Sequence, residues 1–335
     1  MRRLVAVELT RLRWRRAILL LLAAAVVVPA VIFGATAWNT RAPSAAEQAR
    51  MEQIIEKETN RHQVQRQLAK CIANPAQYGL PDDGDPQAAC EEMTLPQPEW
   101  YGLRQPLDLV NEREQGSAIG VVVVLVLLML LGGTTFVGHD WNSGSMSNQL
   151  LFEPRRGRVW AAKGLVVLLS GFVVCLAVLT AYWLGLAGLA SHRNLTVPDG
   201  ALADGLKQGL RGTLIAAFAG LAGYALTMLF RSTVATLGIL FAVAVAGGML
   251  LAVLGISNNQ QWQPQNNAAA VVMDGYHYYD DSGLPSSCFT GQAQDPAECS
   301  TERTLSAGQG GRYLGSLLLL VGIPSVLSFR RRDVP

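Results

Sequence analysis

The sequence predicts an all-α membrane protein with six transmembrane helices, an N-terminal interfacial helix and two extracellular insertions. Composition gives the first indication, because 50% of the 335 residues are hydrophobic and 16% are charged, whereas soluble domains carry about 25% charged residues. The second indication is that the apolar residues concentrate in long runs. The third is that arginines and lysines gather at particular ends of those runs.

Each apolar run is long enough to be a transmembrane helix, since about 20 residues rising 1.5 Å each cross a hydrocarbon core of roughly 30 Å. Pro29 predicts a bend in the first run, and Pro324 interrupts the last. We expect the six spans at residues 17–38, 117–138, 164–190, 209–230, 233–255 and 312–329.

The N-terminal residues 1–16 are basic and amphipathic. Arginines alternate with apolar residues such as Leu4, Leu9 and Leu12, a pattern typical of a helix that lies in the membrane interface. A signal peptide is the competing interpretation, but the apolar run that follows is too long for a typical signal sequence. The residues expected at the interface are Arg11, Arg13, Trp14, Arg15 and Arg16.

Two polar insertions separate the spans, at residues 39–116 and 256–311. In the first, Ser44 and Glu47 have capping-box spacing, which predicts a helix running to about Lys70. Frequent prolines between residues 74 and 106 predict irregular structure after that helix. A shorter polar connection lies at residues 191–208, and a basic tail at residues 330–335.

Four of the five cysteines fall as two pairs, each within one insertion. If the insertions face an oxidising compartment, the pairs form disulfides, Cys71 with Cys90 and Cys288 with Cys299. Four unpaired thiols are the alternative. Cys175 lies inside an apolar run and is expected to be a buried core residue.

Six spans place both chain ends on one side of the membrane. That side would hold residues 1–16, the polar segment 139–163, Arg231 and the tail. The positive-inside rule makes this side cytoplasmic. Both insertions and residues 191–208 are then extracellular, where the cysteine pairs can oxidise. We therefore expect a multi-pass protein of a bacterial-type plasma membrane.

Several classes of chemistry are missing from the sequence. It contains no GxxxxGK[ST] phosphate loop, HExxH or GxSxG motif, so we do not expect an enzyme. The predicted spans carry almost no ionisable residue of the kind that ion-coupled carriers use, and no polar stripe that would line a channel. His277, Asp280 and Asp281 are better explained by a solvated turn than by a metal site, and no metal is expected. Energy for transport would have to come from another subunit.

Gly212, Ala216 and Gly220 are spaced four apart in the fourth predicted span. Such a small-residue face lets another helix approach closely. The favoured interpretation is packing within the same bundle, and the alternative is a seam between two subunits.

The polar segment 139–163 lies between the second and third predicted spans. It begins with Asp140, continues through Gly144 and an apolar patch at Leu150–Phe152, and ends in a basic stretch with Lys163. One interpretation is a solvated loop whose positive charge only sets orientation. The other is a contact surface for a partner outside the membrane, because an exposed apolar patch needs a partner or lipid to cover it.

This order of residues resembles the segment between the second and third spans of membrane subunits of the ABC-2 type transporter family. Those subunits carry an acidic residue, a Gly-Thr-Leu turn, a Leu-Leu-x-x-Pro-x-x-Arg motif and then a lysine. Asp140 and Ser145–Met146 stand where Glu and Thr-Leu are more usual. The basic N-terminal helix, the six spans and the Phe329–Asp333 ending are also similar to the family, whereas residues 39–116 lie outside the resemblance.

The resemblance implies the membrane-spanning permease subunit of an ATP-driven ABC exporter, moving an unidentified, hydrophobic cargo out of the cytoplasm. It implies two cytosolic ABC ATPase subunits that bind ATP and Mg, a second copy or a sister permease, and surrounding membrane lipid. This chain itself would bind no cofactor and no nucleic acid. The alternative is a non-transporting sensor or assembly factor whose extracellular loops bind a ligand. The residues implied in coupling to the ATPase are Asp140, Trp141, Gly144, Met146, Leu150, Leu151, Phe152, Glu153, Pro154, Arg155 and Arg156.

Overall fold

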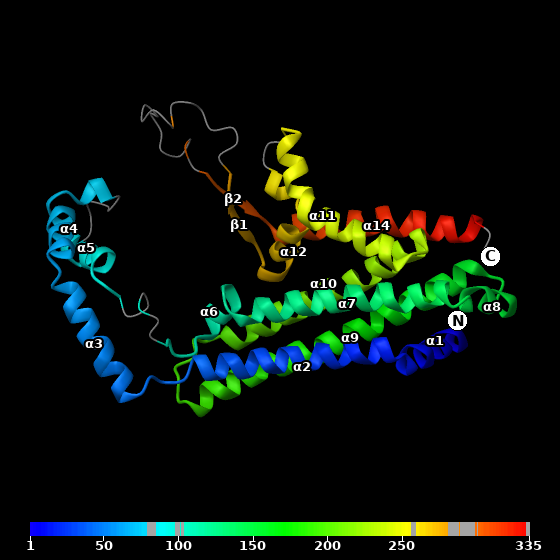
Figure 1. Cartoon of the computed structure of the whole chain (residues 1–335), viewed down its shortest axis with the longest axis horizontal. Helices are drawn as coiled ribbons and strands as arrows, with labels where there is room; N and C mark the ends of the chain where they lie inside the picture. Colours follow the sequence, from blue (N-terminus) through cyan, green and yellow to red (C-terminus); the bar gives the residue numbers. More distant parts are fainter. Residues whose placement is uncertain are drawn as a thin grey trace. The chain divides into compact units, whose positions relative to one another are not determined.

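A computed structural model of the chain divides it into two compact units (Figure 1). We call residues Met1–Phe33 with Asp108–Pro335 the membrane unit, and Gly34–Leu107 the insertion unit. The structure describes residues 1–78, 85–97, 101, 104–255, 259–280, 288, 299 and 301–332. Predictions that concern other residues, such as Asp281 and Asp333, lie outside the described residues.

Within the described residues, six helices are long and apolar enough to cross a membrane, which makes the chain a multi-pass membrane protein of the all-α class. A short helix, α1 (Arg2–Trp14), precedes the first of them. The six are α2 (Arg16–Asn39), α7 (Ser117–Asn142), α9 (Arg156–His192), α10 (Ala201–Phe230), α11 (Thr233–Val253) and α14 (Ala307–Arg331).

Several helices extend well beyond the apolar runs that predicted them. α7 continues past Gly138 to Asn142, and α9 begins at Arg156 rather than Gly164. α10 begins at Ala201, within what the sequence indicated as a polar connection. Hydrophobicity marks the part of a helix suited to lipid, whereas backbone hydrogen bonding continues into polar residues. As a result, Asp140 and Lys163, which lie outside the predicted spans, belong to the ends of long helices.

Helices α7, α9 and α10 form the packed centre of the membrane unit and run side by side in Figure 1. Glycines permit the approach of α7 to α10. A Cβ added at Gly133 would lie 2.0 Å from the carbonyl oxygen of Gly220, and one at Gly212 would lie 2.8 Å from Val122. Ala216 is fully buried. The small-residue face of α10 therefore packs against α7 of the same chain, which was the favoured interpretation.

Both ends of this centre carry polar side chains that bond across helices. Tyr224 of α10 donates to the carbonyl oxygen of Trp160 at 2.8 Å, and Trp160 in turn donates to Ser325 of α14 at 3.1 Å. At the other end, the Ser117 and Tyr182 hydroxyls lie 2.6 Å apart. Buried polar groups need such partners, so these contacts also fix the register of the helices.

The second insertion contains the one departure from all-α structure within the described residues. A two-stranded antiparallel sheet joins β1 (Tyr276–Tyr279) to β2 (Glu302–Leu305), with Tyr276 opposite Leu305. Tyr278 and Leu305 pack with Ala270 in a small separate core. A disulfide joins Cys288 to Cys299. The remaining elements of this region are η3 (Asn259–Trp262) and α12 (Pro264–Met273).

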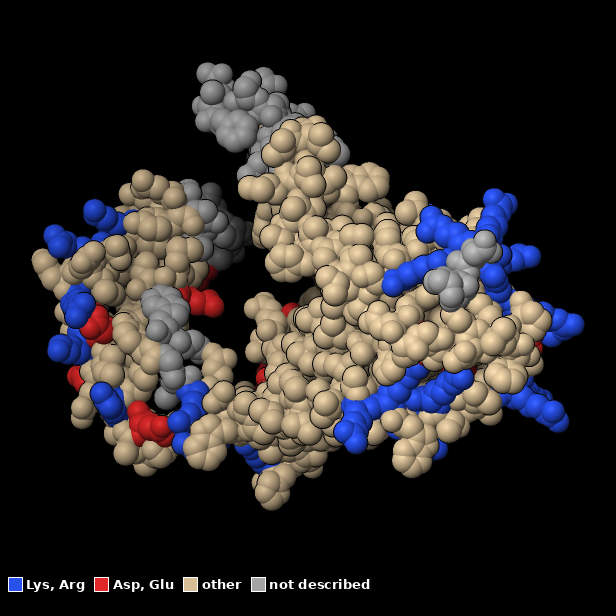
Figure 2. Space-filling model, turned by 45° about the vertical axis from the view of Figure 1, so that its right-hand side comes forward, with Lys and Arg blue, Asp and Glu red and all other residues tan. Residues whose placement is uncertain are grey.

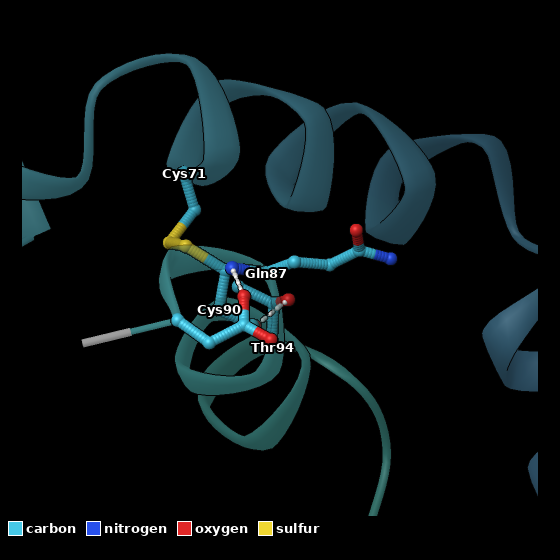
Figure 3. Close-up of a disulfide and its surroundings, with 5 residues drawn as sticks. Cys71, Gln87, Cys90 and Thr94 are labelled. Carbon is cyan, nitrogen blue, oxygen red and sulfur yellow. Dashed lines mark hydrogen bonds between the residues drawn. A yellow bond between two sulfur atoms is a disulfide. The ribbon is translucent and has the colours of Figure 1, made fainter.

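The insertion unit is helical, with α3 (Ala45–Thr59), α4 (His62–Ala73), η1 (Pro75–Tyr78) and α5 (Pro86–Thr94). Ser44 and Glu47 form the expected capping box at the start of α3. The single helix predicted to Lys70 is wrong, because α3 ends at Thr59 and α4 begins at His62. α5 also replaces part of the irregular structure expected from the prolines, with Pro86 in its first turn, where proline is tolerated. A disulfide between Cys71 and Cys90 joins α4 to α5 (Figure 3).

Two shorter helices complete the membrane unit around α7. The first is α6 (Leu109–Glu114), which precedes α7 and is capped by Asp108. The second is α8 (Ser145–Phe152), which occupies most of the polar segment between α7 and α9.

Candidate functional site

A single glycine lies where the chain leaves α7 and enters α8. Gly144 precedes α8 with φ of 68°, a left-handed conformation that a residue with a Cβ rarely adopts. At the other end, Glu153 caps α8 by donating its backbone N–H to the carbonyl of Gln149. Pro154 follows, and α9 begins at Arg156. The local sequence thus makes a separate short helix between two long ones.

A cluster of buried charges lies where α8 meets the long helices. The Nζ atom of Lys163, near the start of α9, lies 2.7 Å from Oδ2 of Asp140 near the end of α7. It also lies 2.7 Å from Oε2 of Glu8 in α1. The side chains of all three residues are fully buried. Arg15 donates to the other oxygen of Asp140 and lies over the ring of Phe136. We call Glu8, Asp140, Lys163 and Arg15 the buried ion cluster.

In the four residues of the buried ion cluster, two carboxylates balance one ammonium and one guanidinium group. Arg11, which is partly exposed, adds a further ion pair to Glu8 at 3.4 Å. Neutrality and hydrogen bonding are what make buried charges tolerable, since each unpaired ion would cost several kcal/mol to desolvate. The four residues come from α1, the α1–α2 junction, α7 and α9. The cluster therefore joins three segments that are far apart in the sequence.

Helix α8 is attached to this cluster through two side chains on its inner face. Ser145 donates to Oδ1 of Asp140 at 2.7 Å. Gln149, one turn further on, donates to Oε1 of Glu8 at 2.6 Å and accepts from Arg11 at 3.0 Å. Met146 lies between them and is fully buried. Since Ser145 and Gln149 are four residues apart, they lie on one face of α8, and this face is held against α1 and α7.

The C-terminal end of α8 is exposed and apolar. The exposed fraction is 80% for Leu151 and 89% for Phe152, which makes Phe152 more exposed than the other large apolar side chains of the described residues. Leu150 is half-buried and packs against the core, while Pro154 and Arg155 are exposed. Burying an apolar side chain such as Phe stabilises by about 1.5–3 kcal/mol. This pair is therefore suited to contact another molecule.

The remaining predicted coupling residues connect the segment to the C-terminal helix. Trp141 packs edge-on against Phe329 of α14, with ring centroids 6.2 Å apart, and Arg231 lies over its ring. Arg156 donates to the carbonyl oxygens of Phe329 and Arg332. Glu153 is half-buried. Phe329, part of the ending that resembles the transporter family, is thus in the same core as Met146.

The residues predicted to lie at the membrane interface divide into two groups. Arg13, Trp14 and Arg16 are exposed, as an interfacial helix requires. Arg11 and Arg15 instead point inward, to Gln149 and Asp140. Basic side chains also gather toward the end of the membrane unit where Figure 1 places α1, α8 and the C-terminal end of α14 (Figure 2).

Sequence reasoning did not identify Glu8 as a site residue. The available signal was that Glu8 is the only acidic residue among residues 1–16. An acid within a basic amphipathic helix suggests an internal partner, but the sequence gives no way to choose Lys163, which lies 155 positions away. Lys163 was noted as part of the basic stretch and as the end of the family-like motif.

No grouping of three or more His, Cys, Asp or Glu residues that could hold a metal ion occurs in the part of the chain that the structure describes. His277 instead lies 2.9 Å from Glu302 across the β1–β2 pair. The carboxylates of the buried ion cluster are paired with the cations of Lys163 and Arg15.

No protein-family model, curated protein or solved structure matches this chain. Any function must therefore be argued from the sequence and from the geometry of α8 and the buried ion cluster.

Proposed function

We propose that this chain is the membrane-spanning subunit of an ATP-driven ABC exporter and that α8 is its coupling helix. The observation that carries the proposal is that α8 is anchored to the membrane unit and is also exposed at its C-terminal end. It is fixed to the membrane unit through Ser145, Met146 and Gln149. Its last two residues, Leu151 and Phe152, are exposed to the outside. A helix that transmits force between a membrane bundle and a partner needs both properties.

The partner would be a pair of cytosolic ATPase subunits that bind ATP and Mg. Leu151 and Phe152 would enter an apolar groove of the ATPase, and exposed Arg155 would form ion pairs at its rim. A movement of α8 would reach α1 and α9 through the buried ion cluster, since a well-packed and hydrogen-bonded contact transmits displacement. This route needs no energy source within the membrane unit itself.

The pairing of the charged residues in the long helices also supports the proposal. Asp140 and Lys163 lie near helix ends and are paired with each other, Glu8 and Arg15. They are therefore committed to structure, and a proton relay would instead need groups free to gain or lose a proton. A second copy or a sister permease would complete the transport path. A hydrophobic cargo fits an apolar bundle.

Co-purification tests the coupling contact. The chain would be expressed with its native host's ATPases and isolated in mild detergent, with wild type compared with Phe152→Glu. We expect a P-loop ATPase to co-purify with wild type, and a loss of about 2 kcal/mol or more of binding free energy in the variant, as for an interface hot spot. ATP-dependent export should fall in parallel.

Val197→Glu is the matched control, because Val197 is also an exposed apolar residue but lies in the connection between α9 and α10. It should retain both the ATPase and export. Equal retention of the ATPase by both variants would exclude α8 as the contact. Repeated isolation of wild type without an ATPase would favour a non-transporting sensor or assembly factor.

A further inference from the structure

An apolar groove runs along the membrane unit beside the helices that carry the buried ion cluster. It is a shallow groove, and the space of about 390 Å³ between its walls is partly open to the surroundings. Five of the helices contribute to its walls, among them α1 with Leu12, α2 with Leu22, α7 with Leu128 and Gly132, and α9 with Ser170. The groove is distinct from α8, whose residues do not line it.

The walls of the groove offer hydrocarbon contact and almost no hydrogen bonding. Ser170 supplies the one side-chain hydroxyl among the lining residues. That hydroxyl already donates to the carbonyl oxygens of Val166 and Val167 in its own helix, at 2.7 and 3.1 Å. A polar ligand would lose its hydration here without finding a partner, whereas an alkyl chain would lose nothing. The groove therefore selects for an apolar chain.

Two adjacent glycines of α7 differ in a way that defines the open part of the groove. A Cβ on Gly133 would collide with the backbone of Gly220, so that glycine is needed for helix packing. A Cβ on Gly132 would meet nothing within 4 Å. The space in front of Gly132 is thus left empty by the protein, although the helices around it are closely packed.

The charge beside the groove indicates which chain-bearing molecule fits. Leu12 of the wall is followed in sequence by Arg13, and Ile18 of the wall lies two residues after Arg16; both arginines are exposed. The nearby acids, Glu8 and Asp140, are fully buried and paired. The exposed charge at the α1–α2 junction is therefore positive, and it complements an acidic headgroup at the membrane surface.

We propose that this groove binds one acyl chain of an anionic phospholipid, with the headgroup held by Arg13 and Arg16. The lipid would fill the space between α2 and α7 and would join α1 to the bundle. This binding is independent of any ATPase, and it can be measured on the isolated chain.

The test uses phosphatidylglycerol carrying a photoreactive diazirine in one acyl chain, mixed into phosphatidylcholine nanodiscs that contain the full chain. We expect cross-links to concentrate on α2 and on residues 128–132 of α7, as mapped by mass spectrometry of peptides. Gly132→Leu should lower this labelling about tenfold, because its side chain takes the place of several methylene groups. Arg16→Gln should lower it about fivefold through loss of one lipid-facing charge.

Gly120→Leu is the matched control, since a Cβ at Gly120 of the same helix also meets nothing within 4 Å and Gly120 does not line the groove. It should label like wild type. If Gly132→Leu is not monodisperse, Ser170→Leu fills the groove from α9 instead. Equal labelling of the groove-filling and control variants, or labelling spread evenly over the lipid-facing helices, would overturn the site. Equal labelling by a diazirine phosphatidylcholine would overturn the anionic headgroup.

Discussion

At the scale of single residues, Lys163 explains why α1 belongs to the membrane unit. Only Glu8 and Leu12 of α1 are buried. Glu8 is held by Lys163 and Gln149, so a large part of the contact between α1 and the bundle is electrostatic. A buried ion pair is weak evidence for net stability, but removal of one partner is costly because it leaves the other charge unpaired.

Replacing Lys163 with methionine should therefore destabilise the protein strongly. The variant leaves Glu8 and Asp140 buried with one fewer cation, and we expect the free energy of unfolding to fall by about 3–5 kcal/mol. Lys207→Met is the control, because its ion pair with Asp204 is largely exposed and should contribute at most about 1 kcal/mol. Denaturant titration in detergent micelles measures both. A loss for Lys163→Met as small as that for Lys207→Met would show that the cluster is not needed for folding.

Glu47 gives α3 a pH-dependent start. The backbone N–H and then the hydroxyl of Ser44 donate to its carboxylate and lower its pKa below the ordinary value of 4.5. A carboxyl whose pKa is lowered by folding stabilises the folded state above the unfolded pKa, and this stabilisation is lost as the pH falls through the folded pKa.

The first turn of α3 should therefore lose hydrogen-exchange protection as the pH falls below about 4.5. Glu47→Gln should remove this dependence, because glutamine can accept in the same capping box but does not titrate in this range. Hydrogen exchange with mass spectrometry on peptides covering residues 44–59 checks both forms. Identical pH profiles for the two would mean that the carboxylate does not control this turn.

At the scale of helices, the contact between α7 and α10 depends on the absence of side chains at particular positions. The backbones approach closely at Gly133 and Gly223, where added Cβ atoms would lie 2.0 and 2.6 Å from carbonyl oxygens of the facing helix. A backbone atom cannot move aside as the end of a flexible side chain can. Any larger residue must therefore push the helices apart.

Gly133→Ala should lower stability by about 1–3 kcal/mol, the usual cost of overpacking a core. Gly132→Ala is a control one position away on the same helix, and its Cβ meets nothing within 4 Å. Alanine favours helix by up to about 1 kcal/mol over glycine, so this control should be neutral or slightly stabilising. Thermal unfolding in the same detergent compares the two variants. A stable Gly133→Ala protein would show that the helices can separate at no cost.

At the scale of the whole molecule, the sequence patterns predicted those structural features that depend on the residues of a single segment. The apolar runs predicted the six long helices, because length and hydropathy are local properties. The start of α9 at Arg156 was missed, because Arg156, Arg158 and Lys163 interrupt the apolar pattern there, whereas the backbone hydrogen bonds of the helix continue through them. Glu8 was missed for a different reason. A buried charge is identified by the oppositely charged residue that it contacts in the folded structure, and the sequence does not show that contact. The exposed apolar patch at Leu151 and Phe152 was visible in the sequence, whereas the inward position of Arg15 was not.

The six long helices also predict which segments of the chain lie on the same side of the membrane. An even number of spans returns the chain to the side on which it began, and one contact supports this independently. Gln149 of α8 bonds to Glu8 of α1, so the N-terminal helix and the segment between α7 and α9 must lie on the same side. We therefore expect the residues between α2 and α7 on the other side of the membrane.

Impermeant maleimide labelling of intact cells tests this arrangement. In a Cys175→Ala background, which removes the buried free cysteine, single cysteines would replace Phe152 of α8 and Glu52 of α3, both exposed. Because the insertion should face outward and α8 inward, we expect Glu52→Cys to react in intact cells, and Phe152→Cys to react only after the membrane is permeabilised. Labelling of both in intact cells would mean that an even number of membrane crossings separates α3 from α8. Labelling of Phe152→Cys alone would reverse the orientation and place α8 where no cytosolic ATPase could reach it.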